Sequence, residues 1–430
     1  MAEQGEHGDG DEAVVWGSAY PPSINAGIPR LGELPASWSR LRMKDMLEVI
    51  ERPVKLVDTQ TYQLVTAKRS RGGIVSRGTL RGDEIKVKQQ FEVRSGDFIL
   101  SNRQIAHGGC GIVPPELDGA VVSGEYTVLH PKPMLDLRFL HYLSHSAYFQ
   151  QICFHSGVGV HVEKLVFRLH DWLNWQIDIP PLPEQQRIAE VLAEFDCAIE
   201  ATDALFMAKQ TKKRAILERL ASETNARPVR LGKLGRFSKG RGIGKSDLAE
   251  TGIPCLRYAE IYTMYGDAIS ELRSRVPVEV AATATKLTTG DIVFASSGET
   301  AEEIGKAVAY LGDQPAVVGG DTIILRGHGQ DASFLAHVLN SDEVVRQKYR
   351  LGQGFSVVHI HAGELAQIEV SLPSLERQRA ASALLAELDR ELVKLADKSQ
   401  ALRQQSRGLM QRLLTSDASM RHMIKEEVAV

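Results

Sequence analysis

The chain has 430 residues, of which 43% are hydrophobic and 24% charged, and its formal net charge is −3. These values are typical of an ordinary soluble protein with two or three domains, and they argue against wholesale coating of nucleic acid. No apolar run is long enough to cross a bilayer, so we expect no membrane partner and a cytoplasmic location. The four cysteines have no paired spacing, which is typical of reduced thiols.

The first part of the chain is expected to be an acidic leader followed by a globular domain. Residues 1–24 contain acids and glycines but no Lys or Arg, which predicts disorder. Residues 25–179 form the first predicted domain. Within it, Met43 to Ile50 has helical spacing, Gly96-Asp97 is a turn that feeds a buried strand, and Leu137 to Phe154 is predicted to be helical.

The rest of the chain repeats this organisation. A long helix is predicted over 180–224, a second domain over 225–371, a second long helix over 372–416, and a tail over 417–430. The two helical segments align without a gap, with Gln185 on Gln378 and Asp196 on Asp389. Gly290-Asp291 matches the earlier turn, and Ser333 to Tyr349 matches the earlier helix. An internal repeat of this kind fixes the architecture before any local pattern does.

Both long helices carry a heptad-like stripe with alternating spacings of three and four residues. Ser399 and Ser406 interrupt the leucines of the second helix, and Thr202, Lys209 and Lys213 stand among the apolar residues of the first. In the second helix the stripe runs from Leu388 to Leu413, and in the first it runs from Phe195 to Leu220. This spacing predicts a coiled coil, and the alternative is two amphipathic helices that each pack on their own domain. If the helices pair, the connectivity makes the coil antiparallel.

The fold class predicted is therefore α/β (α+β), with two tandem recognition domains joined by an antiparallel coiled coil and an internal pseudo-two-fold repeat. Such a protein suits a ligand with two separated sites, and duplex DNA presents such sites.

The proline-rich run from Pro180 to Ala189 resembles a region of the specificity subunits of type I restriction-modification enzymes. The run from Gly252 to Tyr262 and the turn Gly290-Asp291 carry the same resemblance. The resemblance implies that each domain reads one half of a split, asymmetric DNA target, while the helices set the spacer. It also implies that the helices dock two methyltransferase (modification) subunits, which translocating and cleaving restriction subunits join. The second copy departs from the pattern, because Ser374-Leu375-Glu376-Arg377 replaces the proline-glutamate run.

Candidate residues follow from chemistry and from this resemblance. Lys and Arg contact phosphates, whereas Arg, Lys, Asn, Gln and Ser read base edges. The predicted DNA-binding residues are Lys68, Arg69, Arg71, Arg77, Lys86, Lys88, Asn102, Arg103, Lys239, Arg241, Lys245, Arg257, Tyr258, Ser296 and Ser297. The residues that the resemblance implies for partner docking are Pro180, Pro181, Glu184, Gln185, Arg187, Pro373 and Gln378.

Sequence patterns typical of enzymes are incomplete in this chain, so we predict no catalytic residues and no metal site. Gly244-Lys245-Ser246 mimics a phosphate loop, but Lys239 stands where the first glycine is required. His359 and His361 lie two residues apart, which places two imidazoles on one face of a predicted strand as a possible metal pair. No third or fourth ligand is near them in the sequence, and such a pair more often packs or contacts DNA. We expect this chain to bind no cofactor. The resemblance implies S-adenosylmethionine, ATP and Mg²⁺ for the partner subunits. The alternatives are a two-lobed protein-binding scaffold and a DNA-modifying enzyme in its own right.

Overall fold

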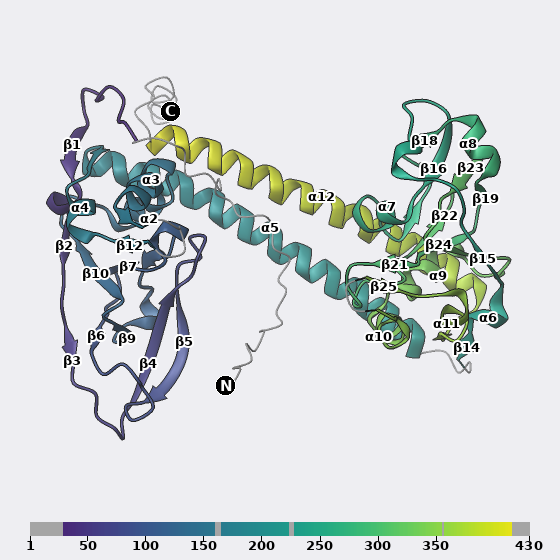
Figure 1. Ribbon diagram of the computed structural model, residues 1–430, viewed down its shortest axis with the longest axis horizontal. Helices are drawn as coiled ribbons and strands as arrows, with labels where there is room; N and C mark the ends of the chain where they lie inside the picture. The colour runs from purple at the N-terminus through teal and green to yellow at the C-terminus, as the bar shows by residue number, and fades with distance from the viewer. Residues whose placement is uncertain (1–28, 160–164, 223–227, 355–356, 415–430) are drawn as a thin grey trace. The chain divides into compact units, whose positions relative to one another are not determined.

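The computed structural model describes residues 29–159, 165–222, 228–354 and 357–414 (Figure 1). The chain divides into two compact units, which are described separately below. Unit 1 comprises Met1–Thr202 with Lys398–Val430, and unit 2 comprises Asp203–Asp397. The predicted leader 1–24 and tail 417–430 lie outside the described residues. Each unit therefore contains one globular domain and part of both long helices.

The two long helices are α5 (Leu182–Ser222) and α12 (Leu375–Leu414), with 41 and 40 residues. In unit 1, Ile188 and Leu192 near the start of α5 share a core with Leu413 at the end of α12. In unit 2, Leu217 near the end of α5 packs with Leu385 near the start of α12. The helices consequently run antiparallel. Every position of the predicted stripe is buried or half-buried, which confirms the coiled-coil prediction.

Both domains are built on the same four-stranded antiparallel sheet. In unit 1 the order is β2-β10-β7-β8, and in unit 2 it is β15-β24-β20-β22 with β17 added at the edge. The strands of unit 1 are β2 (Leu47–Val49), β7 (Phe98–Ser101), β8 (Cys110–Ile112) and β10 (Tyr126–Pro131). The strands of unit 2 are β15 (Arg236–Lys239), β17 (Ala268–Ile269), β20 (Ile292–Ala295), β22 (Ala307–Tyr310) and β24 (Thr322–Arg326). The internal repeat therefore extends through the globular parts.

The turn before β7 and β20 is built in the same way in both units. Gly96 and Gly290 adopt φ values of 87° and 91°, a region that favours glycine. The next residues, Asp97 and Asp291, are buried, and each carboxylate accepts an N–H three residues upstream at 2.8 Å. An arginine forms an ion pair with each buried carboxylate, with an N–O distance of 2.6 Å in both units. In unit 1 it is Arg52, which lies after β2, whereas in unit 2 it is Arg326 at the end of β24.

A pair of helices covers each common sheet. They are α2 (Leu137–Ser144) with α3 (Ala147–His155), and α9 (Ala332–Leu339) with α10 (Asp342–Leu351). Each stretch was predicted as one helix, and the structure corrects this to two. In unit 1 the break occurs because Ser146 leaves the helix and its side chain accepts a hydrogen bond from the Phe149 N–H, which starts α3.

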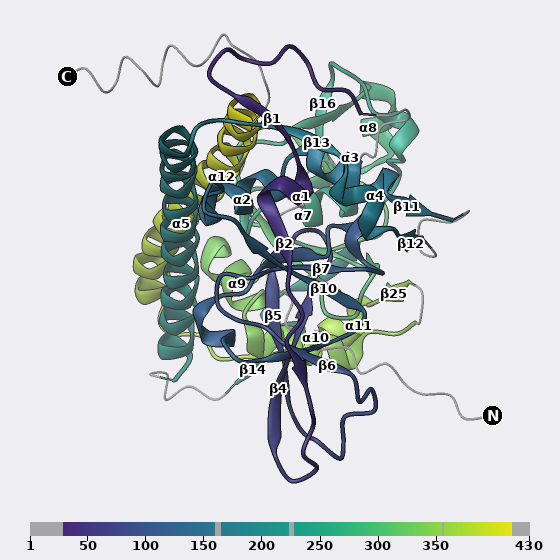
Figure 2. The same ribbon diagram turned by 90° about the vertical axis from the view of Figure 1, so that its left-hand side faces the viewer.

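The units differ in a second sheet that is inserted at the same points between the common strands. In unit 1 its order is β3-β6-β9-β4-β5, and in unit 2 it is β18-β16-β23-β19. The bounds are β3 (Pro53–Val54), β4 (Thr61–Ala67), β5 (Ile74–Arg81), β6 (Gln90–Glu92), β9 (Val121–Ser123), β16 (Ile253–Leu256), β18 (Ser274–Val276), β19 (Thr285–Leu287) and β23 (Ala316–Val318). The long β4–β5 hairpin extends away from α2 and α3 within unit 1 (Figure 2).

Each domain is closed where its first and last strands meet. β1 (Ser39–Arg42) pairs with β13 (Gln176–Ile179), and β14 (Val229–Arg230) pairs with β26 (Glu369–Val370). Short helices, α1 (Met43–Met46) and α6 (Leu231–Leu234), follow β1 and β14. The predicted helix from Met43 to Ile50 is therefore wrong after Met46, because residues 47–49 pair with β10 instead.

The remaining short elements are β11 (Gly157–Val158), β12 (Val166–Phe167), α4 (Leu169–Leu173), α7 (Tyr258–Thr263), α8 (Val278–Thr283), β21 (Ser297–Gly298), β25 (Val358–His359), α11 (Ala362–Leu365) and the 3₁₀ turns η1 (Ile105–His107), η2 (Pro115–Leu117) and η4 (Lys245–Asp247). In the described part of the chain, the hydropathy of every helix falls short of what crossing a membrane requires.

Candidate nucleic-acid interface and helix docking surfaces

The tip of the β4–β5 hairpin lies against the segment that follows β7. Ser70 and Arg71 have φ values of 56° and 60°, and their N–H groups donate to the carbonyls of His107 and Gly108 at 2.7 and 3.2 Å. The Arg69 guanidinium donates to Gln104 at 2.7 Å. The predicted residues Lys68, Arg69 and Arg71 are thereby brought to the loop that carries Asn102 and Arg103.

Asn102 and Arg103 both have partners within unit 1. The Asn102 side-chain oxygen accepts a hydrogen bond from Thr127 at 2.9 Å. The Arg103 guanidinium binds both oxygens of Glu125, and this hydrogen-bonded ion pair raises the pKa of Arg103. Arg103 is 74% exposed, so this surface pair contributes little to stability and can be exchanged for a phosphate at small cost.

The remaining candidates of unit 1 form a second group. Strand register places the Thr61–Arg81 pair at the opposite end of the hairpin from the Ala67–Ile74 pair. At about 3.3 Å per residue, the two ends are about 20 Å apart. Arg77 lies along β5, whereas Lys86 and Lys88 follow the far end, and Lys88 donates to the Gly82 carbonyl at 2.8 Å.

In unit 2, the ends of β15 and β20 lie at one edge of the common sheet. Lys239 pairs with Ile323, and Ala295 pairs with the adjacent Thr322, so Lys239 and Ser296 are about 10 Å apart across two strand spacings. Arg241 and Lys245 are exposed on the loop that leaves this edge. Gly240 is required here, because a Cβ at this position would lie 2.0 Å from the Gly319 carbonyl oxygen.

Three further predicted residues of unit 2 have different surroundings. Arg257 forms an ion pair with buried Glu260 at 2.8 Å, so its guanidinium holds the start of α7 in place. Tyr258 is 37% exposed and remains available. Ser297 is buried, and its hydroxyl lies 3.0 Å from Nδ1 of His359.

His359 is exposed and is absent from the predicted DNA-binding residues. It does not share a strand face with His361, because β25 ends at His359 and the His361 N–H is already capped by Glu364 at 3.0 Å. The considered histidine pair therefore has no common strand face.

The two glutamines at the starts of the long helices are buried, each 1% exposed. Gln185 accepts from the Asp136 N–H at 2.8 Å and donates to the carbonyls of Met134 and Pro180. Gln378 accepts from the Asp331 N–H at 3.0 Å and donates to the Pro373 carbonyl. We therefore correct their predicted docking role: they position the helix on its own domain and do not reach a partner directly.

The other predicted docking residues differ in accessibility. Pro180 is buried, Arg187 and Pro373 are half-buried, and Pro181 is exposed. Glu184 accepts a hydrogen bond from the indole of Trp38 at 3.1 Å. Exposed apolar side chains that were not predicted lie along the helices in unit 2: Leu205, Met207, Leu384 and Val393.

Sequence reasoning also missed the residues that cap and dock α2 and α9. Asp136 and Asp331 each accept the N–H of a phenylalanine three residues later. One turn further on, Tyr142 donates to Asp196 of α5 at 2.7 Å, and His337 lies at the matching position in unit 2 beside Asp389 of α12. An aspartate just before an apolar helical run was the available signal for the caps.

Known proteins share both the sequence pattern and this architecture. Residues 35–205 match the model of the type I restriction modification DNA specificity domain. The specificity subunit of the type I restriction enzyme MjaVIII from Methanocaldococcus jannaschii is 25% identical over 434 aligned residues, which cover 91% of this chain and 95% of that protein. Residues 35–205 of this chain belong to the type I restriction modification DNA specificity domain family.

Two solved structures share the fold of this chain. The type I restriction-modification S subunit from M. genitalium has a TM-score of 0.55 at 16% identity, over 92% of this chain and 98% of that one. A chain from a structure that describes complex assembly and conformational transition of a type I R-M system has a TM-score of 0.54 at 18% identity, over 90% and 100% of the two chains.

Proposed function

We propose that this chain is the DNA-recognition subunit of a type I restriction-modification complex and that it reads a bipartite, asymmetric target. The observation that carries the proposal is the duplicated four-stranded core combined with two unlike inserted sheets. Because the core is common, both domains pack against the long helices in the same way. Different inserted sheets give them different surfaces, so each domain is expected to read a different half of the target.

Basic and polar groups support this assignment in both units; the basic ones are exposed and Ser296 is half-buried. The β4–β5 tip with Lys68 and Arg69 is the proposed contact of unit 1, and the edge carrying Lys239, Arg241 and Ser296 is the proposed contact of unit 2. Arg103 and Tyr258 are proposed to join them. Arg257 and Ser297 are instead assigned to holding the contacts in place, because both are engaged with neighbours inside unit 2.

We propose that the chain performs no chemistry itself and that two methyltransferase subunits dock on its long helices. Exposed apolar side chains on these helices support a protein contact, with Leu205 and Met207 on α5 and Leu384 and Val393 on α12. Restriction subunits are proposed to join the same complex. S-adenosylmethionine, ATP and Mg²⁺ are assigned to these partners, and the assembly is proposed to act in the cytoplasm, where it has access to genomic DNA.

The decisive experiment compares DNA methylation in cells with and without this chain. A bipartite motif that loses methylation on deletion supports the proposal. In vitro, the complex reconstituted with its methyltransferase subunits should bind that motif with an affinity that falls steeply as salt rises. Salt-independent or absent binding by the complex favours the scaffold alternative. Methylation or cleavage by the purified chain without partners favours an enzyme in its own right.

A further inference from the structure

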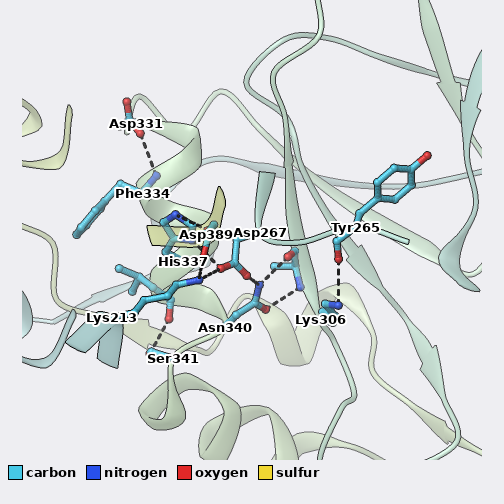
Figure 3. A network of polar contacts seen from close by, with 12 residues as sticks. Lys213, Tyr265, Asp267, Lys306, Asp331, Phe334, His337, Asn340, Ser341 and Asp389 are labelled. Carbon is cyan, nitrogen blue, oxygen red and sulfur yellow. Dashed lines mark hydrogen bonds and ion pairs between the residues drawn. The ribbon is translucent and has the colours of Figure 1, made fainter. Parts of the chain in front are cut away.

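A buried polar cluster in unit 2 joins the recognition domain to both long helices. Its members are Lys213 of α5, Asp267 at the start of β17, His337 of α9 and Asp389 of α12, and their side chains converge in Figure 3. The ligand atoms of Asp267, His337 and Asp389 all lie within 4.8 Å of one another. At the matching position in unit 1 a tyrosine takes the place of the histidine, and Tyr142 donates a hydrogen bond to Asp196.

Asp267 fixes the orientation of the imidazole. Its Oδ2 lies 2.7 Å from Nδ1 of His337 and 2.6 Å from Nζ of Lys213, and its Oδ1 accepts from Asn340 at 2.6 Å. Burial alone raises the pKa of Asp267, but the His337 hydrogen bond and the Lys213 charge outweigh it and hold that pKa below its ordinary value. The contact with Asp267 orients the imidazole so that Nε2 lies toward Asp389 of α12.

The other ring nitrogen of His337, Nε2, then faces the carboxylate of Asp389. Nε2 of His337 makes no hydrogen bond, although the side chain is only 1% exposed. It lies 3.6 Å from Oδ2 of Asp389, whose other oxygen accepts from Lys213 at 2.6 Å. A buried ring nitrogen that lacks a hydrogen bond and lies near a carboxylate oxygen is an unsatisfied position that a bound cation would fill.

We propose that His337 Nε2 and Asp389 Oδ2 bind a divalent transition-metal cation of the Zn²⁺ class. Metal–ligand bonds of about 2.0–2.2 Å at a tetrahedral angle place two ligand atoms about 3.4 Å apart. The observed separation is 3.6 Å. A histidine that donates its second N–H to a carboxylate is also the usual arrangement of a zinc ligand, and Asp267 supplies that carboxylate.

A cavity adjoins the cluster and can supply the remaining ligands as water. A cavity of about 660 Å³ lies beside the cluster and is lined by Lys213, Asp267, His337 and Asn340 among others. Water from this cavity completes the coordination shell, as is usual where the protein supplies fewer than four ligands. Lys213 need not leave, because it binds Oδ1 of Asp389 and not Oδ2. A bound cation would link α9 of the domain to α12.

The test titrates the metal-free full-length chain with Zn²⁺ by calorimetry and with Co²⁺ by visible absorption. We expect saturable binding of one ion per chain and a rise of the thermal unfolding temperature with Zn²⁺. His337→Gln and Asp389→Asn should each abolish this binding, and Asp267→Asn should weaken it about 10–100-fold. The matched control in unit 1, Asp196→Asn, should leave the affinity unchanged.

A further variant keeps the proposal testable if His337→Gln fails to fold. Lys213→Met removes a positive charge beside the site and should tighten Zn²⁺ binding. The proposal is overturned if the wild-type chain binds no ion, if binding survives Asp389→Asn, or if Lys213→Met leaves the affinity unchanged. Nitrogen NMR of His337 provides an independent readout, because a protonated Nε2 in the presence of Zn²⁺ also contradicts the site.

Discussion

Replacing Gln185 with leucine should destabilise unit 1 selectively, because this buried side chain joins α5 to its domain through three hydrogen bonds. The Asp136 N–H donates to it at 2.8 Å, and the carbonyls of Met134 and Pro180 each accept from it at 2.9 Å. Leucine has a similar volume but no polar atoms. The substitution therefore leaves one N–H and two carbonyls without partners at a site that is 1% exposed.

The expected loss of unfolding free energy is about 3 kcal/mol. The orphaned N–H accounts for about 2 kcal/mol, and the two carbonyls together add about 1 kcal/mol, because each retains a second lone pair for other contacts. The neighbouring residue Gln186 is exposed and provides the matched control. Gln186→Leu should change the unfolding free energy by less than about 0.5 kcal/mol.

Tryptophan fluorescence during urea unfolding measures this effect in one unit. The described residues contain three tryptophans, Trp38, Trp172 and Trp175, and all three belong to unit 1. Gln185→Leu should therefore lower the urea midpoint measured by fluorescence. Gln378→Leu should mainly lower the midpoint measured by circular dichroism, because that signal also reports unit 2. A loss below about 1 kcal/mol for Gln185→Leu, or an equal loss for Gln186→Leu, would refute the reasoning.

Three other predictions follow from the helices, the hairpin and a buried lysine. Inserting seven residues in register into both α5 and α12 should lengthen the gap between the half-sites by about 10 Å, or about three base pairs, without changing either half. Methylation mapping measures the gap. Altered half-sites or an unchanged gap would contradict the prediction. The double variant Lys68→Ala/Arg69→Ala should lower DNA affinity and reduce the slope of log affinity against log salt concentration by about 2, as measured by fluorescence anisotropy. The control Lys212→Ala on α5 should change neither quantity. An unchanged slope in the double variant would show that the hairpin tip does not contact DNA. Burial lowers the pKa of Lys348 to about 7. Between about pH 7 and 10 the unfolded chain therefore binds a proton that the folded chain does not. The unfolding free energy should consequently rise with pH, by up to about 1.4 kcal/mol per pH unit. Lys348→Met should flatten this rise in urea unfolding followed by circular dichroism, and a rise that persists in the variant would assign the effect to another group.

The sequence by itself determined the repeated architecture, because the responsible signals are local and periodic. The stripe from Leu388 to Leu413 needs only helical geometry to become a buried seam. The Gly-Asp turns at 96–97 and 290–291 need only a positive φ and a carboxylate that caps its own turn. The same locality explains the error after Met46, where strand pairing with β10 outweighed helical spacing.

Only the tertiary structure decided which side chains meet and which remain exposed. Gln185 and Gln378 looked like surface residues of a docking motif, but the folded domain buries both, since they satisfy backbone groups about 50 residues away. Arg69 reaches Gln104, and Asp267 reaches both His337 and Lys213, across separations that no periodic pattern encodes. Burial and long-range contact depend on the packing of whole elements, which is why the chemistry of these residues became visible only in the fold.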